Sequence, residues 1–217
     1  MYKRQIYGRL RTAIQTTELK PGAAISENDI AQQLGVSRTP VRDAFMRLTA
    51  EGLVRSVPQI GTFVAKLDLG AIREALFIRE ALECTALRHC AERLGPPRIA
   101  VLRAIARRHA QAVREQNLQE IKRQDEALHR ALIELSGFPG AWRIVLQARD
   151  MHERVRAISV PMLRGGDRSA QHHRAIVAAL AAGDVAAAEA TLRAHIQMNG
   201  AFAEDIARRM PEYFDAP

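Results

Sequence analysis

The residues with the clearest capacity for chemistry are one carboxylate and three imidazoles. Asp125 and His129 are four residues apart in a pattern that predicts a helix, so both side chains project from one side of it. His173 and His195 each fall on the apolar stripe of a separate predicted helix. An oxygen donor with three imidazole nitrogens suits zinc, nickel or manganese. We therefore predict that these four side chains hold a divalent cation inside a helical bundle.

Each of these residues has a plainer interpretation when it is taken alone. A single inward-facing histidine is usually a hydrogen-bonded core residue, but one cation satisfies four buried polar groups at once. The remaining histidines agree with no apolar stripe and are interpreted as ordinary: His89, His109, His152 and His172. Two alternatives stay open, a metal-dependent hydrolase-like enzyme and a regulator with a purely structural metal. Against the enzyme, no further carboxylate or histidine is clearly placed as a general base.

Two arginines of the predicted helices offer positive charge to an anion. Arg79 and Glu83 share an apolar stripe with Ile72, Leu76, Ala86 and Cys90. A guanidinium in such a stripe is costly unless it is paired. Arg79 therefore either pairs with Glu83 one turn away or binds a carboxylate ligand. Arg154 is the second candidate for this role, and it flanks a stripe of Ile144, Ala148, Met151, Val155 and Ile158.

A different group of residues has the chemistry of DNA recognition. Ser37, Arg38, Thr39 and Arg42 lie at the start of a predicted helix, and both arginines project from one face. The apolar positions on the opposite face are Val41, Ala44, Phe45 and Leu48. Arginine donates two parallel bonds to guanine or clamps a phosphate, and first-turn amides favour a phosphate. The alternative is that two arginines merely solvate an exposed helix face.

The elements around these arginines follow the order of a winged helix-turn-helix. A first amphipathic helix ends before Lys20-Pro21-Gly22. A second helix begins at its cap Ser26 and ends at Gly35, and a third helix follows the cap Ser37. Residues 53–57 and 62–65 read as strands around a turn at 58–61. Residues 1–67 are therefore predicted to form a winged helix-turn-helix DNA-binding domain.

From Asp68 onward the pattern contains helices only. We predict them at 69–94, 96–116, 118–136, 139–163, 168–182 and 184–209, separated by glycine- and proline-containing breaks. Short connections favour antiparallel packing of neighbouring helices. The predicted fold class is mostly α, with an N-terminal winged helix-turn-helix and a C-terminal antiparallel all-helical bundle. Residues 68–217 would bind an effector and form the dimer.

The composition is that of an ordinary globular protein, with 47% hydrophobic and 26% charged residues. The formal net charge is +8, and positive charge is densest in the first 68 residues, where a phosphate-facing surface is expected. No run has the length of a membrane span and no apolar signal segment follows Met1, so we expect a cytoplasmic protein without a membrane partner. The spacing of Cys84 and Cys90 predicts free thiols.

The N-terminal residues resemble the GntR family of transcriptional regulators. The matching segments are LKPG (19–22), ISENDIA (25–31), LGVSRTPVRDA (34–44), LTAEGLV (48–54) and GTFV (61–64). The resemblance implies that Arg38, Thr39 and Arg42 contact double-stranded operator DNA. It also implies that Gly61 brings the wing to the minor groove, where a side chain would hold the backbone away. Asn28 stands where many members carry a DNA-contacting arginine, and asparagine can still bond a base or a phosphate.

The C-terminal residues resemble the ligand-binding (FCD) domain of FadR-type GntR regulators. The family pattern has Asp-x-x-x-His on one helix, a histidine ahead of an Ile…Ala-Leu…Gly-Asp run, and a last histidine. These positions fall on Asp125, His129, His173 and His195. The resemblance implies that they bind a divalent metal, for which we expect zinc ahead of nickel or manganese. His172 and Phe138 depart from the pattern, since glutamate and asparagine are frequent at these two positions.

In members with this set, the metal helps to hold a small carboxylate effector, and an arginine at the place of Arg79 lines the pocket. We therefore expect a homodimer whose two winged helix-turn-helix domains bind a palindromic operator. Capture of an organic acid in each bundle would change operator affinity by favouring one of two states. Regulators of this kind commonly repress an operon and release it when the acid accumulates.

Overall fold

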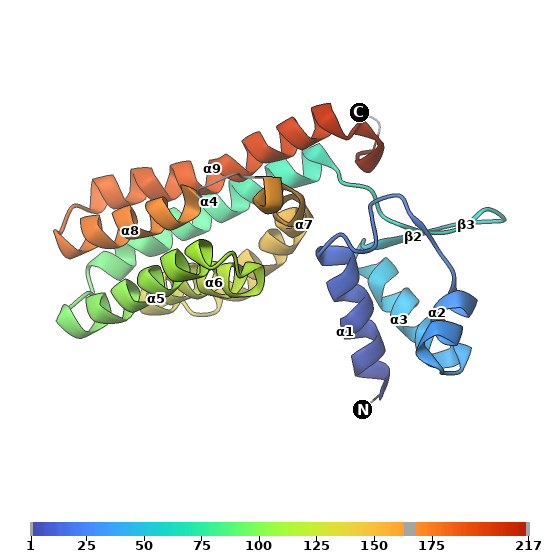
Figure 1. The fold of residues 1–217 in the computed structure, drawn as a ribbon. Helices are drawn as coiled ribbons and strands as arrows, with labels where there is room; N and C mark the ends of the chain where they lie inside the picture. Colours follow the sequence, from blue (N-terminus) through green and yellow to red (C-terminus); the bar gives the residue numbers. More distant parts are fainter. Residues whose placement is uncertain (1, 163–167, 216–217) are drawn as a thin grey trace. The chain divides into compact units, whose positions relative to one another are not determined.

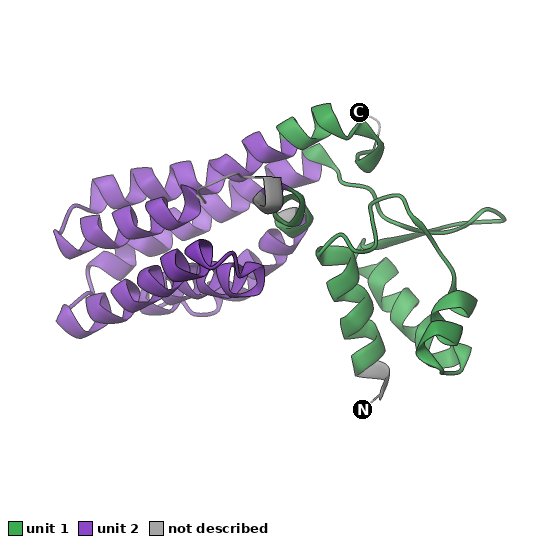
Figure 2. Ribbon diagram, in the orientation of Figure 1, with its two compact units in different colours: residues 1–69, 153–158, 204–217 green, residues 70–152, 159–203 purple. Residues whose placement is uncertain are grey.

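The computed structural model describes residues 2–162 and 168–215. The chain is mostly helical, as predicted, and divides into two compact units (Figures 1 and 2). The first unit contains residues 1–69, 153–158 and 204–217, and the second contains residues 70–152 and 159–203. Residues 1, 163–167 and 216–217 of the predicted ranges lie outside the described part. No described helix is long and apolar enough to cross a membrane.

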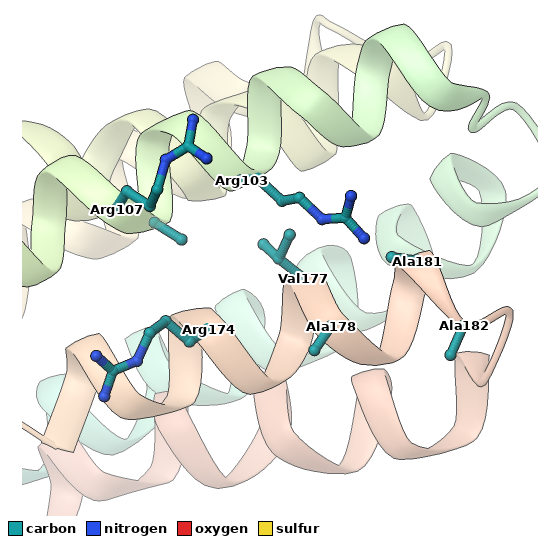
Figure 3. Close-up of a pocket in the computed structure, with 8 residues that line it drawn as sticks. Arg103, Arg107, Arg174, Val177, Ala178, Ala181 and Ala182 are labelled. Atoms are coloured by element: carbon teal, nitrogen blue, oxygen red, sulfur yellow. The ribbon is translucent and has the colours of Figure 1, made fainter.

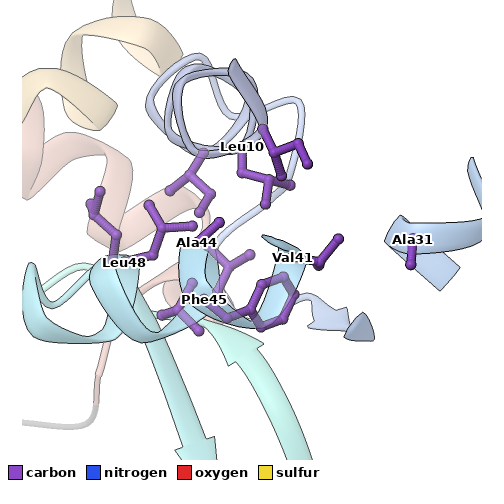
Figure 4. Close-up of a cluster of buried hydrophobic side chains, with 11 residues drawn as sticks. Leu10, Ala31, Val41, Ala44, Phe45 and Leu48 are labelled. Atoms are coloured by element: carbon purple, nitrogen blue, oxygen red, sulfur yellow. The ribbon is translucent and has the colours of Figure 1, made fainter. Parts of the chain in front are cut away.

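The first unit begins with the helices α1 (Tyr2–Gln15), α2 (Glu27–Leu34) and α3 (Arg38–Ala50). Apolar residues three and four positions apart place one face of each helix in a shared core. Figure 4 shows Val41, Ala44, Phe45 and Leu48 of α3 gathered with Leu10 of α1. The other buried members of this core are Ile6, Ile14, Ala31, Leu53, Val54 and Val64. This core holds α3 by its apolar face and leaves the opposite face exposed.

The caps of α2 agree with the prediction, and that of α3 differs in part. The Ser26 hydroxyl accepts hydrogen bonds from the backbone N–H groups of Asn28 and Asp29, and Gly35 closes α2 with a φ of 64°. Ser37 stands at the N-cap of α3 with extended backbone, but its side chain makes no cap hydrogen bond. Ser37 therefore occupies the predicted cap position without the cap hydrogen bond, and the residue lies exposed at the start of α3.

The predicted hairpin is present as β2 (Val54–Val57) and β3 (Gly61–Val64), paired antiparallel with Val57 opposite Gly61. A third strand that the sequence did not predict, β1 (Ala24–Ile25), pairs with the other side of β3 and completes a sheet of order β1-β3-β2. Two residues are too short to show a period of two, which explains the omission. The hairpin forms the wing of the helix-turn-helix.

The residues after the wing pair with the C-terminal tail. The Leu67 N–H donates to the carbonyl of Tyr213 at 2.8 Å, and the Asp215 N–H donates to the carbonyl of Leu67 at 2.9 Å. A short 3₁₀ helix, η1 (Pro211–Tyr213), leads the tail to this position. Consequently residues 204–217, which lie in the predicted C-terminal domain, belong to the first compact unit.

In the described part of the chain, six helices contribute to the bundle of the second unit, and each begins and ends within three residues of its predicted range. They are α4 (Leu69–Ala91), α5 (Pro96–Arg114), α6 (Leu118–Leu135), α7 (Ala141–Met162), α8 (Arg168–Ala181) and α9 (Val185–Arg209). Residues 153–158 of α7 and 204–209 of α9 nevertheless belong to the first unit. Glycine and proline mark the breaks, as at Gly95-Pro96 and at Gly183, which has a φ of 77°. Helix α5 packs against both α6 and α8.

The buried face of α7 differs from the prediction. Ile144 and Met151, two members of the predicted stripe, are 46% and 44% exposed, whereas Val145 and Arg149 are buried. Helix α7 carries apolar residues on more than one face, and from sequence alone an arginine is expected at the surface even where it is buried. The other three members of the predicted stripe are buried as predicted, so the buried face of α7 differs only in part, with Val145 and Arg149 in place of Ile144 and Met151.

Candidate metal centre and candidate nucleic-acid interface

Three helices bring the four predicted ligands together inside the second unit. Asp125 and His129 come from α6, His173 from α8 and His195 from α9. Each offers one donor atom, and these atoms all lie within 4.8 Å of one another. None of the four side chains is more than 3% exposed. The i, i+4 spacing on α6 thus produces the local pair that was predicted, and packing of α8 and α9 supplies the other two imidazoles.

The distances between these donor atoms fit a small cation. Nε2 of His195 lies 3.1 Å from Nε2 of His129 and 3.7 Å from Oδ1 of Asp125, which lies 3.4 Å from Nε2 of His173. Donors at zinc–ligand distances of about 2.0–2.1 Å in a tetrahedron are separated by about 3.3 Å. Nε2 of His173 is buried and has no hydrogen-bond partner among the described residues. A cation would satisfy it, so the residues present fit a divalent metal.

The second polar atom of three ligands is engaged by a buried neighbour. Nδ1 of His129 bonds to Oε2 of Glu83, and Arg149 donates to Oδ2 of Asp125 at 2.6 Å. Nδ1 of His173 lies 2.8 Å from Nδ1 of His109. These contacts leave Nε2 of His129, Oδ1 of Asp125 and Nε2 of His173 directed at the shared centre. Such outer partners fix the orientation and tautomer of metal ligands.

The protonation states also agree with metal binding, which needs neutral imidazoles. Burial lowers the pKa of His173 well below its usual value, and the neighbouring His195 lowers it further. Burial lowers the pKa of His129 as well, although Glu83 opposes this shift. Burial alone would raise the pKa of Glu83, but the charge of Arg79 and the hydrogen bonds from His129 and Arg79 outweigh it and hold this pKa far below its usual range. Glu83 is therefore an ionised acceptor, and His129 must donate from Nδ1.

The two arginines predicted to bind an effector lie in different places. Arg79 is 1% exposed, donates from Nε to Oε1 of Glu83 at 2.6 Å, and has Nη2 3.5 Å from Nδ1 of His129. It thus lies beside the cluster. Arg154 belongs to the first unit, where it donates from Nη1 to the carbonyl of Ala65 and from Nη2 to that of Lys66 at 3.2 Å. The structure does not bring Arg154 to the cluster, because both terminal nitrogens hold the chain that leaves the wing.

The roles of three residues of this site were not predicted, or were predicted only in part, from the sequence. Arg149 lies outside the stripe predicted for α7 and was not predicted to be buried, and His109 was interpreted as ordinary although it is fully buried. Glu83 was recognised only as a partner for Arg79. The signal for His109 was its place four residues after Ile105 and seven after Leu102, both buried on the same face of α5.

The second unit also has a surface groove that is separate from these residues. Its volume is about 440 Å³, and Arg103 and Arg107 of α5 face Arg174 of α8 across it (Figure 3). The remaining lining residues are Ala106, Val177, Ala178, Ala181 and Ala182. None of the predicted ligands or effector-binding arginines lines it.

The predicted DNA-binding residues lie on the exposed parts of the first unit. Ser37, Arg38, Thr39 and Arg42 are exposed at the start of α3, and Asn28 is exposed in the first turn of α2. Arg38 is 67% exposed, with Nη2 3.5 Å from the carboxylate of Glu27. Because the core holds the opposite face of α3, this end can enter a groove of DNA without unfolding.

Gly61 is exposed at the start of β3, with a φ of 147° that favours glycine over other residues. The preceding turn carries Gln59, also at positive φ, and Ile60, which is 73% exposed. The wing therefore presents an uncharged tip with little side chain at Gly61, as its predicted approach to the minor groove requires.

Comparison with protein families agrees with both halves of the chain. Residues 2–64 match the model described as "Bacterial regulatory proteins, gntR family", and residues 74–198, more than half of the chain, match the FCD domain. The chain belongs to the GntR family. Its FCD domain fits the FadR-type branch of the GntR regulators.

Individual relatives lead to the same conclusion. The chain is 37% identical over 212 residues to an "Uncharacterized HTH-type transcriptional regulator in unstable DNA locus" of Streptomyces ambofaciens, a match that covers 98% of this chain and 89% of the relative. It is 29% identical over 193 residues to the "HTH-type transcriptional repressor RspR" of Escherichia coli K12, covering 89% of this chain and 85% of the relative. The structure of E. coli McbR/YncC has the same fold, with a TM-score of 0.74, 23% identity and coverage of 94% and 98%.

These findings decide between the classes of function left open by the sequence. The GntR relatives are transcriptional regulators rather than enzymes, so the hydrolase-like alternative is set aside. This GntR-family chain is a DNA-binding transcriptional regulator with an FCD domain that contains a buried cluster able to hold a metal.

Proposed function

We propose that this regulator is a repressor whose affinity for operator DNA is controlled by a small organic acid bound at a metal in the helical unit. The observation that carries the proposal is the buried cluster of Asp125, His129, His173 and His195 in a DNA-binding regulator. Two relatives are named as repressors, RspR and a "Probable D-xylose utilization operon transcriptional repressor" of Paenarthrobacter nicotinovorans, 34% identical over 81% of this chain.

The four residues of the cluster would hold the ion, with zinc as the expected metal and nickel or manganese as alternatives. When bound, the ion supplies a local positive charge that attracts a carboxylate. The chain's own contribution is to keep the imidazoles of His129 and His173 neutral and one carboxylate oriented in a buried site. Arg79 adds a guanidinium at the edge of the cluster, and we assign it to the effector's carboxylate group. Its bond to Glu83 holds it in place before the acid arrives.

The DNA-binding end is assigned to Ser37, Arg38, Thr39, Arg42 and Asn28, with Gly61 in the wing. All six are exposed, and the arginines supply charge for phosphates or guanine edges. We place the functional boundary between residues 67 and 68, so that residues 1–67 read DNA and residues 68–217 bind the effector and the second subunit.

Because a palindromic operator is bound by two DNA-binding domains, the proposed assembly is a homodimer. The helical unit offers apolar surface for it. Phe77 and Ile78 of α4 are 75% and 39% exposed, and Leu146 of α7 is also exposed. Exposed apolar side chains of this size commonly mark interfaces when they form a patch. Sedimentation of the full chain would give twice the monomer mass if the assignment is right.

The first test is thermal melting of the zinc-loaded protein with a panel of mono- and dicarboxylic acids. A ligand that binds only the native state raises the melting temperature with its concentration. The Asp125→Ala/His195→Ala variant tests dependence on the cluster, and His89→Ala serves as a matched control outside it. We expect one acid to stabilise the wild type and the control but not the double variant. The same acid should weaken binding to the operator.

Two results would count against parts of this proposal. If zinc stabilises the wild type but no acid does, the metal is structural and the regulatory signal enters elsewhere. If the double variant binds zinc as tightly as the wild type, the cluster is not the metal site at all.

A further inference from the structure

The interior of the second unit contains a fourth buried imidazole beside the three that belong to the proposed ligand set. His109 of α5 is fully buried, and its Nδ1 lies 2.8 Å from Nδ1 of His173, with the two ring centroids 4.5 Å apart. Ser169 Oγ lies 3.4 Å from the other nitrogen of His109, Nε2. The three side chains therefore form a short row that ends at Nε2 of His173, which faces Oδ1 of Asp125 at 3.4 Å.

The contact between the two Nδ1 atoms limits where the protons lie. A separation of 2.8 Å between ring nitrogens is a hydrogen bond, so one Nδ1 carries a hydrogen and the other accepts it. If His109 donates, the neutral ring of His173 must carry its own hydrogen on Nε2, and that atom has no lone pair for a metal. If His173 donates, its Nε2 is free to bind a metal, and Nε2–H of His109 points at Ser169.

We infer that His109 is a positioning residue of the metal site: it accepts the Nδ1 hydrogen of His173 and so holds that ring in the tautomer whose Nε2 binds the ion. The inference rests on the proposed metal site. His109 itself contributes no ligand atom, because its Nδ1 is used by His173 and its Nε2 by Ser169. It plays the part for His173 that Glu83 plays for His129, with a neutral acceptor in place of a carboxylate.

The neutral acceptor has a consequence for the charge of the site. Glu83 and Asp125 each lie against an arginine, Arg79 and Arg149, at 2.6 Å. In the metal-free protein, a third carboxylate in place of His109 would add an unbalanced negative charge to this interior, which is costly. A second imidazole orients His173 without that cost.

The test compares zinc affinity of the full chain by competition with a chromophoric chelator. His109→Phe fills the space but removes the acceptor, whereas His109→Asn keeps an amide oxygen at the place of Nδ1. The control is His89→Phe, a partly exposed histidine outside the cluster. We expect zinc binding to be 10- to 100-fold weaker in His109→Phe, as is typical when an outer partner is lost, and close to wild type in His109→Asn and in the control.

A second measurement needs no variant. In the zinc-loaded wild type, ¹⁵N spectra of labelled histidine should show His173 with a hydrogen on Nδ1 and none on Nε2. Equal affinities of the wild type and His109→Phe, loss of affinity in His109→Asn to the level of His109→Phe, or a hydrogen on Nε2 of His173 would each overturn the inference. A wild type that binds no zinc removes the proposed metal site with it, so the two failures are distinguishable.

Discussion

Neutralising Glu83 should destabilise the metal-free protein by an amount that the structure sets. In Glu83→Gln the guanidinium of Arg79 stays buried without its counter-charge, because Oε1 of Glu83 accepts from Nε of Arg79 at 2.6 Å. The charge centres of such a pair are about 4 Å apart, at which attraction is about 4 kcal/mol at an effective dielectric of about 20. Breaking one side of a buried pair costs about 3–5 kcal/mol, and we expect a loss in this range.

The assay is urea unfolding in the presence of a chelator, with three further variants. Removing both charges, in Arg79→Met/Glu83→Gln, should recover most of the loss, because no charge is then left unpaired. Glu120→Gln, which removes an exposed pair with Arg123 on α6, should remain close to wild type. Arg79→Met completes the double-mutant cycle. A loss below about 1 kcal/mol in Glu83→Gln would refute the reasoning, because the buried pair would then contribute no more than a surface pair.

The same variant has a predicted pH dependence. Burial by itself would raise the pKa of Glu83 in the folded protein, but the charge of Arg79 and the hydrogen bonds from His129 and Arg79 lower it. A carboxyl whose folded pKa is lowered stabilises the protein above its unfolded pKa of about 4.3 and loses that contribution as the pH falls below it. The difference between wild type and Glu83→Gln should therefore be constant from pH 7 to 5 and should shrink towards pH 3. A difference that grows on acidification would contradict the sign.

Further predictions concern the DNA-binding domain and the two cysteines. Arg42→Ala should weaken operator binding at all salt concentrations, as a gel-shift titration would measure. If Arg42 contacts a phosphate, the slope of log affinity against log salt concentration should also fall by about one. Unchanged affinity would show that Arg42 does not contact the operator. Gly61→Ala should cost about 1–3 kcal/mol of strain at a φ of 147°, lowering the melting temperature, and an unchanged melting temperature would show that the wing relaxes. Ser26→Ala should cost about 1 kcal/mol in urea unfolding through loss of the α2 cap. Burial raises the pKa of both Cys84 and Cys90 to about 11. Both thiols should therefore react slowly with Ellman's reagent at pH 8 until the chain is unfolded. Fast reaction of the folded protein would show that the two thiols are accessible.

Several features of the DNA-binding domain could be predicted because each depends on residues that are close in sequence. The periodicity of α3, the caps of α2 and the turn before Gly61 each depend on residues within a few positions of one another. The strand β1 and the pairing of Leu67 with the C-terminal tail escaped prediction. Both join segments distant in sequence, and neither leaves a periodic signal in two or three residues.

The candidate site divides in the same way. Asp125 and His129 share a helix face, and the stripes around His173 and His195 turn these rings inward, so the four-residue cluster followed from helical periodicity. Arg154 and Arg149 show the limit of that reasoning. They lie five residues apart on α7, yet one bonds to the backbone at Ala65 and the other to Asp125. An arginine beside an apolar stripe has no sequence feature that names its partner.

By itself, then, the sequence determined the winged helix-turn-helix, the helical bundle and the inward direction of the ligand side chains, because a helix of 3.6 residues per turn converts spacing into direction. Only the tertiary structure decided that His109 meets His173, that Glu83 meets His129, and that Arg149 orients Asp125. These contacts join residues 24 to 64 positions apart. They depend on which helices pack together and in what register, which periodicity along one helix does not specify.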